Sequence, residues 1–356
     1  MKEFRIEELA EVVSGGTPST KNSAYWDGEI LWVTPKDLSN SSKKWICSSI
    51  STITTEGLKN SAARMLPANS VLLSSRAPIG YLALAGKPLC TNQGFKSMIC
   101  NKDIILPEYL YYYLQTKVEE LNNISTGSTF KELSASLLKS YTITIHEFAL
   151  QQHIVDILGS IDEKIENNEQ EIRKINDLAL CFIAKSNNLN TELKPYIKFI
   201  KGKKPIENGR TTAPYLSIDA ITSFRYESVY SDDMIMATPF DILMVMDGAS
   251  SGTVFSHQAG VVSSTIAKID CSDNIKDYLY WYLLSLKEII KSRNTGSAIP
   301  HANKEYILSL KFDYGFATDI KTINILHSLR TKIIQLQEEN KKLQKLKGLY
   351  LKKLYE

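Results

Sequence analysis

The sequence is poor in cysteine and lacks any long apolar run. Its cysteines are Cys47, Cys90, Cys100, Cys181 and Cys271. Because they are odd in number and include no C-x-x-C pair, they argue against a disulfide framework and a zinc site, and for a reducing compartment. No stretch approaches the roughly 20 apolar residues needed to cross a bilayer. Met1–Phe4 does not open a signal peptide, so we expect no membrane association.

The sequence also carries little net charge, +3 over 356 residues. A nucleic-acid partner is permitted but not required, since phosphates are neutralised by local basic clusters rather than by a basic total. Apolar residues make up 43% and charged residues 23% of the chain. Such values are typical of a folded protein, and the length leaves room for two domains.

Motifs for catalysis and cofactor binding are missing. The chain has no G-x-x-x-x-G-K-[ST] phosphate loop, and Ser14–Thr17 lacks the third glycine of a dinucleotide fingerprint. The Asn/Asp-Pro-Pro-aromatic tetrapeptide of amino-methyltransferases is absent as well. The histidines, which show no ligand spacing, are His146, His153, His257, His301 and His327. We therefore expect a chain that is not an enzyme and holds neither a cofactor nor a metal.

What the sequence does contain is a heptad pattern in two places. Near the C-terminus the pattern occupies Leu326, Leu329, Ile333, Leu336, Asn340, Leu343, Lys347, Tyr350 and Leu354. Within residues 150–185 it occupies Ile154, Leu158, Ile161, Ile165, Asn168, Ile172, Ile175, Ala179 and Phe182. Steps of three and four over about four heptads are typical of coiled-coil helices. A single such helix needs a partner for its seam, so we expect these two helices to pair with each other.

Charge and one asparagine in each seam favour an antiparallel pair. Residues 150–185 include seven acidic and four basic side chains, whereas residues 319–356 include nine basic and four acidic ones. Opposite flank charges favour the hetero-pair over either self-pair. Asn168 and Asn340 lie at the midpoints of their seams, so an antiparallel alignment places them opposite each other, where a buried amide pair fixes register. The alternative is that both side chains are exposed.

The chain contains an internal repeat. Residues 108–114 (E-Y-L-Y-Y-Y-L) recur at 277–283 (D-Y-L-Y-W-Y-L), and 125–128 (S-T-G-S) recur at 294–297 (N-T-G-S), both 169 positions later. Residues 154–165 match 322–333 at an offset of 168. Three matches in one order indicate two copies of one unit, each a globular segment followed by a long helix.

Several strands and helices are predicted from the sequence. In the first copy, strands are expected at Ile30–Val33, Ser70–Ser74, Tyr81–Leu84, Ser97–Cys100 and Tyr141–Ile145, with a turn at Thr34–Asp37. A helix is expected after Pro107, and a short helix between the loop Ser125–Lys131 and the strand at Tyr141. In the second, residues 214–218, 241–245, 247–252 and 261–266 take the places of 31–33, 70–74, 76–80 and 90–95. The tyrosines of the helix after Pro107 are predicted to pack in the core rather than to stack on bases.

Two loop-bearing bodies joined by a helix pair suit the reading of two half-sites on a duplex, because protein symmetry mirrors half-site spacing. Arg and Lys suit guanine and phosphate, Asn and Gln suit adenine, and Ser and Thr suit phosphates or either base. A helix from Leu326 to Leu354 spans roughly 43 Å at about 1.5 Å per residue. That length could separate the half-site centres by about one duplex turn.

The sequence resembles the specificity (S) subunits of type I restriction–modification systems. The motifs that carry the resemblance are G-G-T-P-S (15–19), W-x-G (26–28), W-V-T-P-K-D-L (32–38), L-P-A-N-S-V-L-L-S-S-R-A-P-I-G (66–80), T-N-Q-G-F (91–95), Y-L-Y-Y-Y-L (109–114) and Q-Q-x-I-V-x-I-L-x-x-I-D-x-K-I (151–165). The second copy departs from it: the T-P-S, R-A-P-I-G and T-N-Q-G-F motifs are absent, and its helix begins with Asp319 instead of Gln-Gln.

The resemblance implies an α+β protein with two strand-rich α/β target recognition domains separated by two long helices. On this basis we expect recognition domains at 1–148 and 188–316, and the helices of an antiparallel coiled coil at 149–187 and 317–356. It also implies a non-catalytic bacterial or archaeal cytoplasmic subunit that binds double-stranded DNA. Two modification subunits bring S-adenosylmethionine, and in many members two restriction subunits bring ATP and magnesium.

The DNA-binding candidates are polar and basic residues of the predicted loops. In the first copy they are Thr17, Ser19, Lys21, Lys36, Arg76, Asn92, Gln93, Lys96, Thr126, Ser128 and Lys131. In the second copy they are Lys201, Lys203, Lys204, Arg210, Ser250, Ser251, Thr295, Ser297 and His301. Asn92 and Gln93 could equally cap loops.

Two other functions remain open from the sequence. The first is a protein-interaction scaffold whose coiled coil and two lobes bind other proteins and no DNA. The second is a self-sufficient enzyme, which the missing motifs disfavour. A salt-dependent DNA-binding assay separates the leading hypothesis from the scaffold, because phosphate contacts give a steep dependence on salt.

Overall fold

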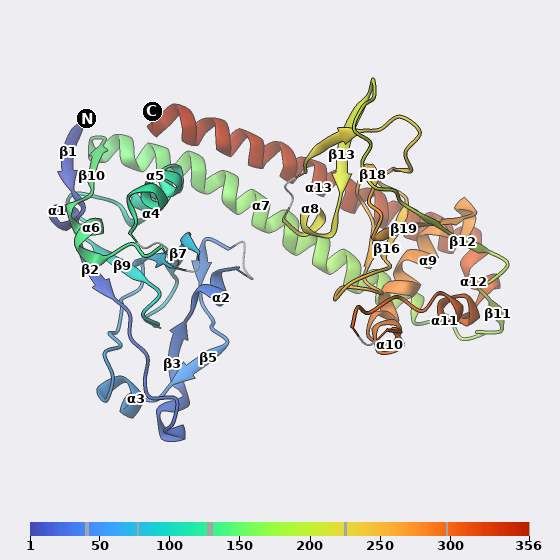
Figure 1. Ribbon diagram of the computed structural model, residues 1–356, viewed down its shortest axis with the longest axis horizontal. Helices are drawn as coiled ribbons and strands as arrows, with labels where there is room; N and C mark the ends of the chain where they lie inside the picture. The colour runs from blue at the N-terminus through green and yellow to red at the C-terminus, as the bar shows by residue number, and fades with distance from the viewer. Residues whose placement is uncertain (40–42, 77, 127–130, 224–225, 297, 356) are drawn as a thin grey trace. The chain divides into compact units, whose positions relative to one another are not determined.

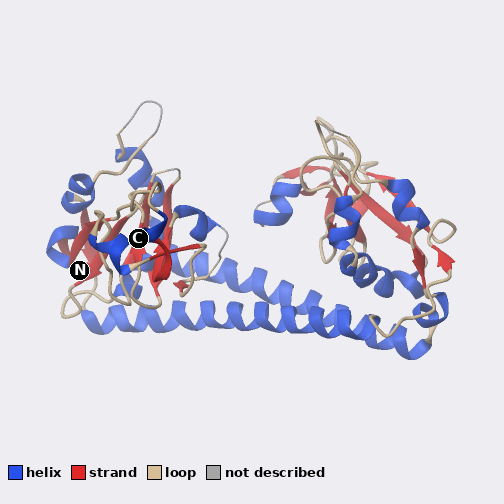
Figure 2. Ribbon diagram, turned by 90° about the horizontal axis from the view of Figure 1, so that it is seen from below, coloured by secondary structure: helices blue, strands red, loops and turns tan. Residues whose placement is uncertain are grey.

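The computed structural model describes residues 1–39, 43–76, 78–126, 131–223, 226–296 and 298–355. The chain forms two compact units: unit 1 comprises Met1–Glu166 with Lys342–Glu356, and unit 2 comprises Asn167–Lys341. In each unit strands and helices are interleaved, and two long helices, α7 (Phe148–Ile183) and α13 (Ile320–Tyr355), contribute to both units (Figures 1 and 2). The fold is thus α+β, as the sequence predicted.

Unit 1 is built on two main sheets. Its strands are β1 (Lys2–Arg5), β2 (Ala10–Ser14), β3 (Trp26–Val33), β4 (Trp45–Ile46), β5 (Ser51–Ile53), β6 (Val71–Ser75), β7 (Ile79–Ala85), β8 (Cys90–Thr91), β9 (Lys96–Cys100) and β10 (Thr142–Ile145). Its shorter helices are α1 (Ile6–Leu9), η1 (Ser23–Tyr25), α2 (Pro35–Ser39), α3 (Thr55–Lys59), α4 (Pro107–Thr116), α5 (Val118–Ile124) and α6 (Ala135–Ser140). The sheet orders are β2-β9-β6-β7-β4 and β5-β3-β8, with β1 paired to β10.

Unit 2 repeats this plan with fewer residues. Its strands are β11 (Thr191–Glu192), β12 (Ile197–Lys201), β13 (Thr212–Leu216), β14 (Ser228–Tyr230), β15 (Met236–Ala237), β16 (Ile242–Val245), β17 (Val254–Phe255), β18 (Gly260–Val262), β19 (Ile266–Cys271) and β20 (Lys311–Phe312). Its shorter helices are α8 (Ile218–Ser223), α9 (Asp273–Ser285), α10 (Lys287–Ser292), α11 (Lys304–Ser309) and α12 (Tyr314–Thr318). The sheet orders are β12-β19-β16-β17 and β14-β13-β18-β15, with β11 paired to β20.

The sheet orders of the two units correspond over most of their strands. The order β2-β9-β6-β7 matches β12-β19-β16-β17, and β5-β3-β8 matches β14-β13-β18. A parallel pair is shared as well: β3 pairs in parallel with β8, and β13 pairs in parallel with β18. Parallel pairing requires a long crossover, so its recurrence is specific. The internal repeat predicted from the sequence is confirmed.

The aromatic helices α4 and α9 belong to the cores. Pro107 occupies the first turn of α4, where its missing N–H costs no hydrogen bond. Tyr109 and Tyr112 of α4 are fully buried, as is Trp281 of α9. The prediction that these rings pack in the interior is confirmed, and buried rings cannot stack on bases.

In unit 2, α7 and α13 pack against each other antiparallel. Asn168 Nδ2 donates to Asn340 Oδ1 at 2.8 Å, and both side chains are buried. Further along α7, Glu171 lies 3.3 Å from Lys332, which precedes Asn340 on α13. The two amides that the sequence places at the seam midpoints are therefore hydrogen-bonded.

In unit 1 the same two helices meet through a polar contact. Lys347 Nζ of α13 lies 2.6 Å from Asp162 Oδ1 of α7, and Tyr112 of α4 donates to Asp162 Oδ2 at 2.7 Å. Around this contact, Ile154 and Leu158 of α7 lie in one apolar cluster with residues of α4 and α13. The carboxylate thus ties both long helices to the body of unit 1.

The Gln-Gln pair at the start of α7 has a structural role. Gln151 is buried, its Oε1 accepts from the Leu106 N–H at 3.0 Å, and its Nε2 donates to the carbonyls of Ile104 and His146. One side chain therefore satisfies three backbone groups next to α4. In unit 2 the matching position is Asp319, which accepts from the Thr322 N–H and caps α13.

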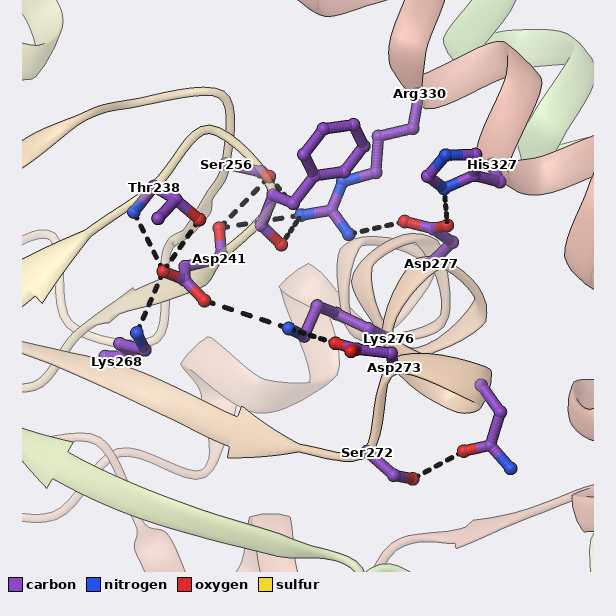
Figure 3. Close-up of polar contacts among 12 residues, drawn as sticks. Thr238, Asp241, Ser256, Lys268, Ser272, Asp273, Lys276, Asp277, His327 and Arg330 are labelled. Atoms are coloured by element: carbon purple, nitrogen blue, oxygen red, sulfur yellow. Dashed lines mark hydrogen bonds and ion pairs between the residues drawn. The ribbon is translucent and has the colours of Figure 1, made fainter.

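The docking of α13 onto unit 2 depends on a fully buried arginine (Figure 3). Arg330 Nη1 lies 2.8 Å from Asp277 Oδ1 of α9, and its Nη2 donates to the Phe240 carbonyl at 2.6 Å and to Ser256 Oγ. The guanidinium also lies over the Tyr280 ring, 4.9 Å from its centroid. A buried cation needs such partners, because unpaired burial is costly.

One short segment differs from its predicted conformation. Thr34–Asp37 enters helix α2 instead of making an isolated turn, because the Asp37 carboxylate accepts from the Thr34 N–H and hydroxyl at 2.8 and 2.6 Å. The apolar stretch from Ile6 first forms one helical turn, α1, before β2 begins at Ala10. In the described part of the chain, no helix has the length and apolarity to span a bilayer.

We predict that Arg330→Met destabilises unit 2 by about 3–5 kcal/mol, because Asp277 and the Phe240 carbonyl lose their buried partner. The matched control is Lys332→Met on the same helix, whose ion pair is about half exposed; its cost should stay within about 1 kcal/mol. Hydrogen exchange of α9 and α13 measures both. Equal protection in the two variants would contradict the assigned role of Arg330.

Candidate nucleic-acid interface

In unit 1, three backbone hydrogen bonds hold the predicted loops together. The Gly15 N–H donates to the Phe95 carbonyl at 3.4 Å, and the Ser75 N–H donates to the Gly94 carbonyl at 2.7 Å. The Leu133 N–H donates to the Ser75 carbonyl at 2.9 Å. The described residues of four loops, 15–22, 76 with 78–80, 91–95, and 126 with 131–132, therefore leave the sheet at one place. We call this group of loops surface 1.

Unit 2 has the same three bonds. The Gly202 N–H donates to the Ile266 carbonyl at 2.9 Å, and the Met246 N–H donates to the Thr265 carbonyl at 2.8 Å. The Ala302 N–H donates to the Met246 carbonyl at 2.8 Å. The described residues of loops 202–210, 247–252, 261–265, and 295–296 with 298–301, together with Lys201 at the end of β12, form surface 2. Its loops correspond to those of surface 1.

A glycine is required at the same point of both surfaces. A Cβ on Gly15 would lie 1.9 Å from the Asn92 carbonyl oxygen, and one on Gly202 would lie 2.2 Å from the Val262 carbonyl oxygen. Neither glycine has a positive φ, so close approach of two backbones is the reason for glycine. Gly202 could not be found from the G-G-T-P-S motif of unit 1, because unit 2 shares the close backbone contact at this glycine but not the motif.

The correspondence pairs side chains of different chemistry. Each of these positions is next to a residue that makes a shared backbone hydrogen bond. On this basis Ser14 matches Lys201, Arg76 matches Asp247 and Glu132 matches His301. The backbone supports the last pair, since Thr126 bridges Glu132 just as Thr295 bridges His301. The two surfaces thus share a backbone frame and differ in side-chain chemistry at matching positions.

Two of the predicted residues of surface 1 contact each other. Thr17 Oγ1 donates to Gln93 Oε1, joining the first loop to the third. Asn92 instead caps its own loop, because its Oδ1 accepts from the Gly94 N–H at 2.9 Å. A Cβ on Gly94 would also meet Pro35 at 3.3 Å, so the start of α2, with the candidate Lys36, lies beside this loop.

Most other candidates of surface 1 are exposed and one is not. The exposed ones are Ser19, Lys21, Lys36, Thr126 and Lys131, and Arg76 is half-buried. Lys96 is buried, with its ammonium 3.6 Å from Glu132. The prediction that Lys96 contacts DNA rested on residue type alone and is corrected. The ion pair with Glu132 turns the ammonium inward, away from the surface. Ser128 lies outside the described residues.

Surface 2 gathers several basic candidates. Lys201, Lys203, Lys204, Arg210, Thr295 and His301 are exposed, and Ser250 is half-buried. Ser251 is fully buried and its hydroxyl accepts from Asn294 Nδ2 at 2.7 Å, so the prediction that it contacts DNA is corrected on the ground of burial. Ser297 lies outside the described residues.

Two acidic residues organise the charges of surface 2. Asp232 accepts from the backbone N–H groups of Thr211 and Arg210, which hold the pKa of Asp232 below its usual value. Asp247 lies 2.8 Å from Lys201 Nζ and 2.8 Å from His301 Nδ1. Partial burial opposes ionisation of Asp247, but the hydrogen bonds from Lys201 and His301 outweigh it and lower its pKa.

Sequence reasoning missed Asp247 and Glu132. The candidates chosen from the sequence were basic, amide and hydroxyl side chains and one histidine. Asp247 and Glu132 each lie one position from a shared backbone hydrogen bond, which only the fold reveals. Among the residues that the structure describes, no group of three or more His, Cys, Asp or Glu side chains could hold a metal ion.

The chain has relatives among known proteins. Residues 1–177 match the family described as type I restriction modification DNA specificity domain. The chain is 44% identical over 178 residues to the specificity subunit of the type I restriction enzyme MjaIX of Methanocaldococcus jannaschii, covering 49% of this chain and 41% of that protein. It is 33% identical over 171 residues to the MjaVIII specificity subunit of the same organism, covering 45% and 40%.

These alignments span about two fifths of the two curated relatives. A solved structure agrees over the whole chain: the S subunit of a type I restriction–modification system from M. genitalium has a TM-score of 0.59. It covers 100% of this chain and 96% of that one, at 18% identity. At that identity the agreement shows the shared fold.

We predict that Gly15→Ala and Gly202→Ala each destabilise their unit by about 1–3 kcal/mol, because a methyl group would overlap a backbone carbonyl. The matched control is Gly348→Ala in α13, where a Cβ meets nothing within 4 Å. In that helix alanine should be neutral or stabilising by up to about 1 kcal/mol. Urea unfolding reports all three, and wild-type stability of Gly15→Ala would contradict the close approach.

Proposed function

Because this chain belongs, through residues 1–177, to the family of type I restriction modification DNA specificity domains, we propose that it is the DNA-recognition subunit of a type I restriction–modification complex. The observation that carries the proposal is the shared backbone frame of surfaces 1 and 2. Each frame holds polar loops at the end of a rigid sheet, where base-reading side chains gain from fixed placement.

In this proposal each surface reads one half of a two-part target. The target is asymmetric, because corresponding positions carry different side chains, such as Glu132 and His301. The exposed basic residues bind phosphates and set the position on the duplex, while neutral polar groups such as Gln93 read base edges. The domain limits at 148, 187 and 316 remain predictions within this proposal.

The long helices act as the spacer between the half-sites. Helices α7 and α13 have 36 residues each, which corresponds to roughly 54 Å at about 1.5 Å per residue. The Asn168–Asn340 pair sets the register of this spacer, because any shift along the seam leaves a buried amide without its partner. A fixed register gives a fixed gap between the half-sites.

Catalysis is assigned to partners. The chain lacks phosphate-loop and methyltransferase motifs, so two modification subunits would supply the S-adenosylmethionine chemistry. Two restriction subunits, where present, would supply ATP and magnesium-dependent cleavage. This chain would bind double-stranded DNA and dock those subunits in a bacterial or archaeal cytoplasm, with no catalytic role of its own.

We predict that the complex of this chain with its modification subunits binds DNA with an affinity that falls steeply with salt. Lys203→Ala should weaken binding to all sequences and lower the slope of log K against log salt by about 1, the value of one phosphate contact. The matched control is Lys194→Ala, an exposed lysine before the opposite end of β12, which should leave the slope unchanged. Absence of salt-dependent DNA binding would favour the protein scaffold.

A second prediction concerns the gap. Seven residues with the same apolar spacing are inserted after Ile165 in α7 and after Leu343 in α13, both on the same side of the Asn168–Asn340 pair. The gap of the methylated motif should widen by about three base pairs, since seven residues add roughly 10 Å, while both half-motifs stay unchanged. In the control, the seven residues are inserted in α7 alone. The seam residues beyond the insertion then no longer face their partners on α13, and modification should be abolished. Altered half-motifs with an unchanged gap would contradict the spacer.

A further inference from the structure

Surface 2 contains a cluster of three polar side chains whose matching positions in surface 1 carry Ser14, Arg76 and Glu132. Asp247 lies between Lys201 and His301, with 2.8 Å to the Nζ of the first and 2.8 Å to the Nδ1 of the second. The side chains of Lys201 and His301 are each 49% exposed, and that of Asp247 is 26% exposed. The cluster is therefore both internally bonded and open to a ligand.

The backbone under His301 is fixed on two sides. Thr295 and His301 exchange both of their backbone hydrogen bonds, at 2.9 and 2.7 Å. On the other side Asp247 bridges His301, and the Gly248 N–H donates to the Pro300 carbonyl at 2.9 Å. A ring held in this way loses little freedom when it binds, so its contacts contribute fully to selectivity.

The bond to Asp247 decides what His301 can offer to a ligand. An ionised carboxylate only accepts hydrogen bonds, so Nδ1 of the ring must carry the proton. In the neutral imidazole the outer nitrogen, Nε2, is then an acceptor. Lys201 and Asp247 cancel each other's charge. With a neutral ring the cluster has no net charge, which suits base reading better than phosphate binding.

An exposed acceptor distinguishes two classes of base in the major groove. Adenine and cytosine present amino groups there, at N6 and N4, whereas thymine and guanine present the O4 and O6 acceptors at the corresponding place. An acceptor on the protein forms a hydrogen bond with the amino group of adenine or cytosine and is repelled by the carbonyl oxygen of thymine or guanine. His301 thus has the chemistry to separate amino from keto bases on one strand.

We propose that His301, oriented by Asp247, reads an amino base, adenine or cytosine, at one position of the half-site bound by surface 2. This inference rests on the proposed function. His301 is the base-reading residue, and Asp247 is a positioning residue that acts through it. Surface 1 carries Glu132 at the matching position and Arg76 in place of Asp247, so its half-site follows a different rule.

The first test needs no DNA. In the full chain labelled with ¹⁵N-histidine, the His301 ring signals, assigned by their loss in His301→Ala, should show the Nδ1–H tautomer at neutral pH. In Asp247→Ala the ring should shift toward the Nε2–H tautomer, which free imidazole side chains favour. An Nε2–H ring in the wild-type chain would overturn the inference and leave the proposed function untouched.

The second test reads selectivity in the assembled complex with its modification subunits. His301→Ala should reduce discrimination between amino and keto bases at one position of one half-motif by about tenfold, the worth of one hydrogen bond of about 1.4 kcal/mol. Asp247→Ala should change the same position. His301→Gln, whose amide oxygen is an acceptor, should restore part of the discrimination.

Two controls separate this inference from the general function. Lys203→Ala should weaken binding to every sequence without altering the motif, and Glu132→Ala should affect the other half-motif only. If the complex binds DNA with a steep salt dependence but His301→Ala keeps the full motif, the inference fails and the proposed function stands. If the complex does not bind DNA at all, both fail.

Discussion

One hydrogen bond constrains the rest of the structure: Asn168 of α7 donates to Asn340 of α13 at 2.8 Å within a mostly apolar seam. Asn168 also donates to Glu339 at 2.8 Å, so its amide is well satisfied only in this alignment. A slip of one heptad in either direction would place Asn340 opposite Ile161 or Ile175, at about 1–3 kcal/mol for an unsatisfied amide. The apolar contacts of a coiled coil tolerate such slips, since every heptad resembles the next. The amide pair therefore selects one register among many of similar apolar burial.

Each long helix also carries a charged residue whose contacts are specific to the unit it packs on. Asp162 of α7 and Arg330 of α13 occupy matching positions of the repeat, 168 residues apart. In unit 1 the Asp162 carboxylate accepts a hydrogen bond from Tyr112 and pairs with Lys347. In unit 2 the Arg330 guanidinium pairs with Asp277. Exchange of the two helices would place Asp162 against Asp277 and leave like charges buried together, which is strongly unfavourable. The opposite charges of Asp162 and Arg330 thus favour packing of α7 at this position in unit 1 and of α13 in unit 2.

The sequence revealed what depends on periodicity and repetition, and missed what depends on loop conformation. The seams of α7 and α13, the amide pair and the repeat follow from spacing alone, and Pro107 locates the start of α4. Lys96 was chosen for its charge, but an ion pair with Glu132 turns it inward. Asp247 was overlooked, because its contacts with Lys201 and His301 join segments far apart in the chain. The three-bond frame consists of backbone contacts between loops whose sequences differ in the two units, so no residue pattern marks it.

The role of the Asn168–Asn340 pair in setting helix register is tested most directly by a double-mutant cycle on the two amides. The free energy of unfolding is measured for the wild-type chain, Asn168→Ala, Asn340→Ala and the double variant. If the two amides stabilise one register through each other, each single variant leaves a buried amide unpaired, and the double variant loses less than the sum of the two, with a coupling of about 1 kcal/mol or more. Additivity within roughly 0.3–0.5 kcal/mol, the behaviour of independent sites, would contradict the claim that this pair sets the alignment of the helices.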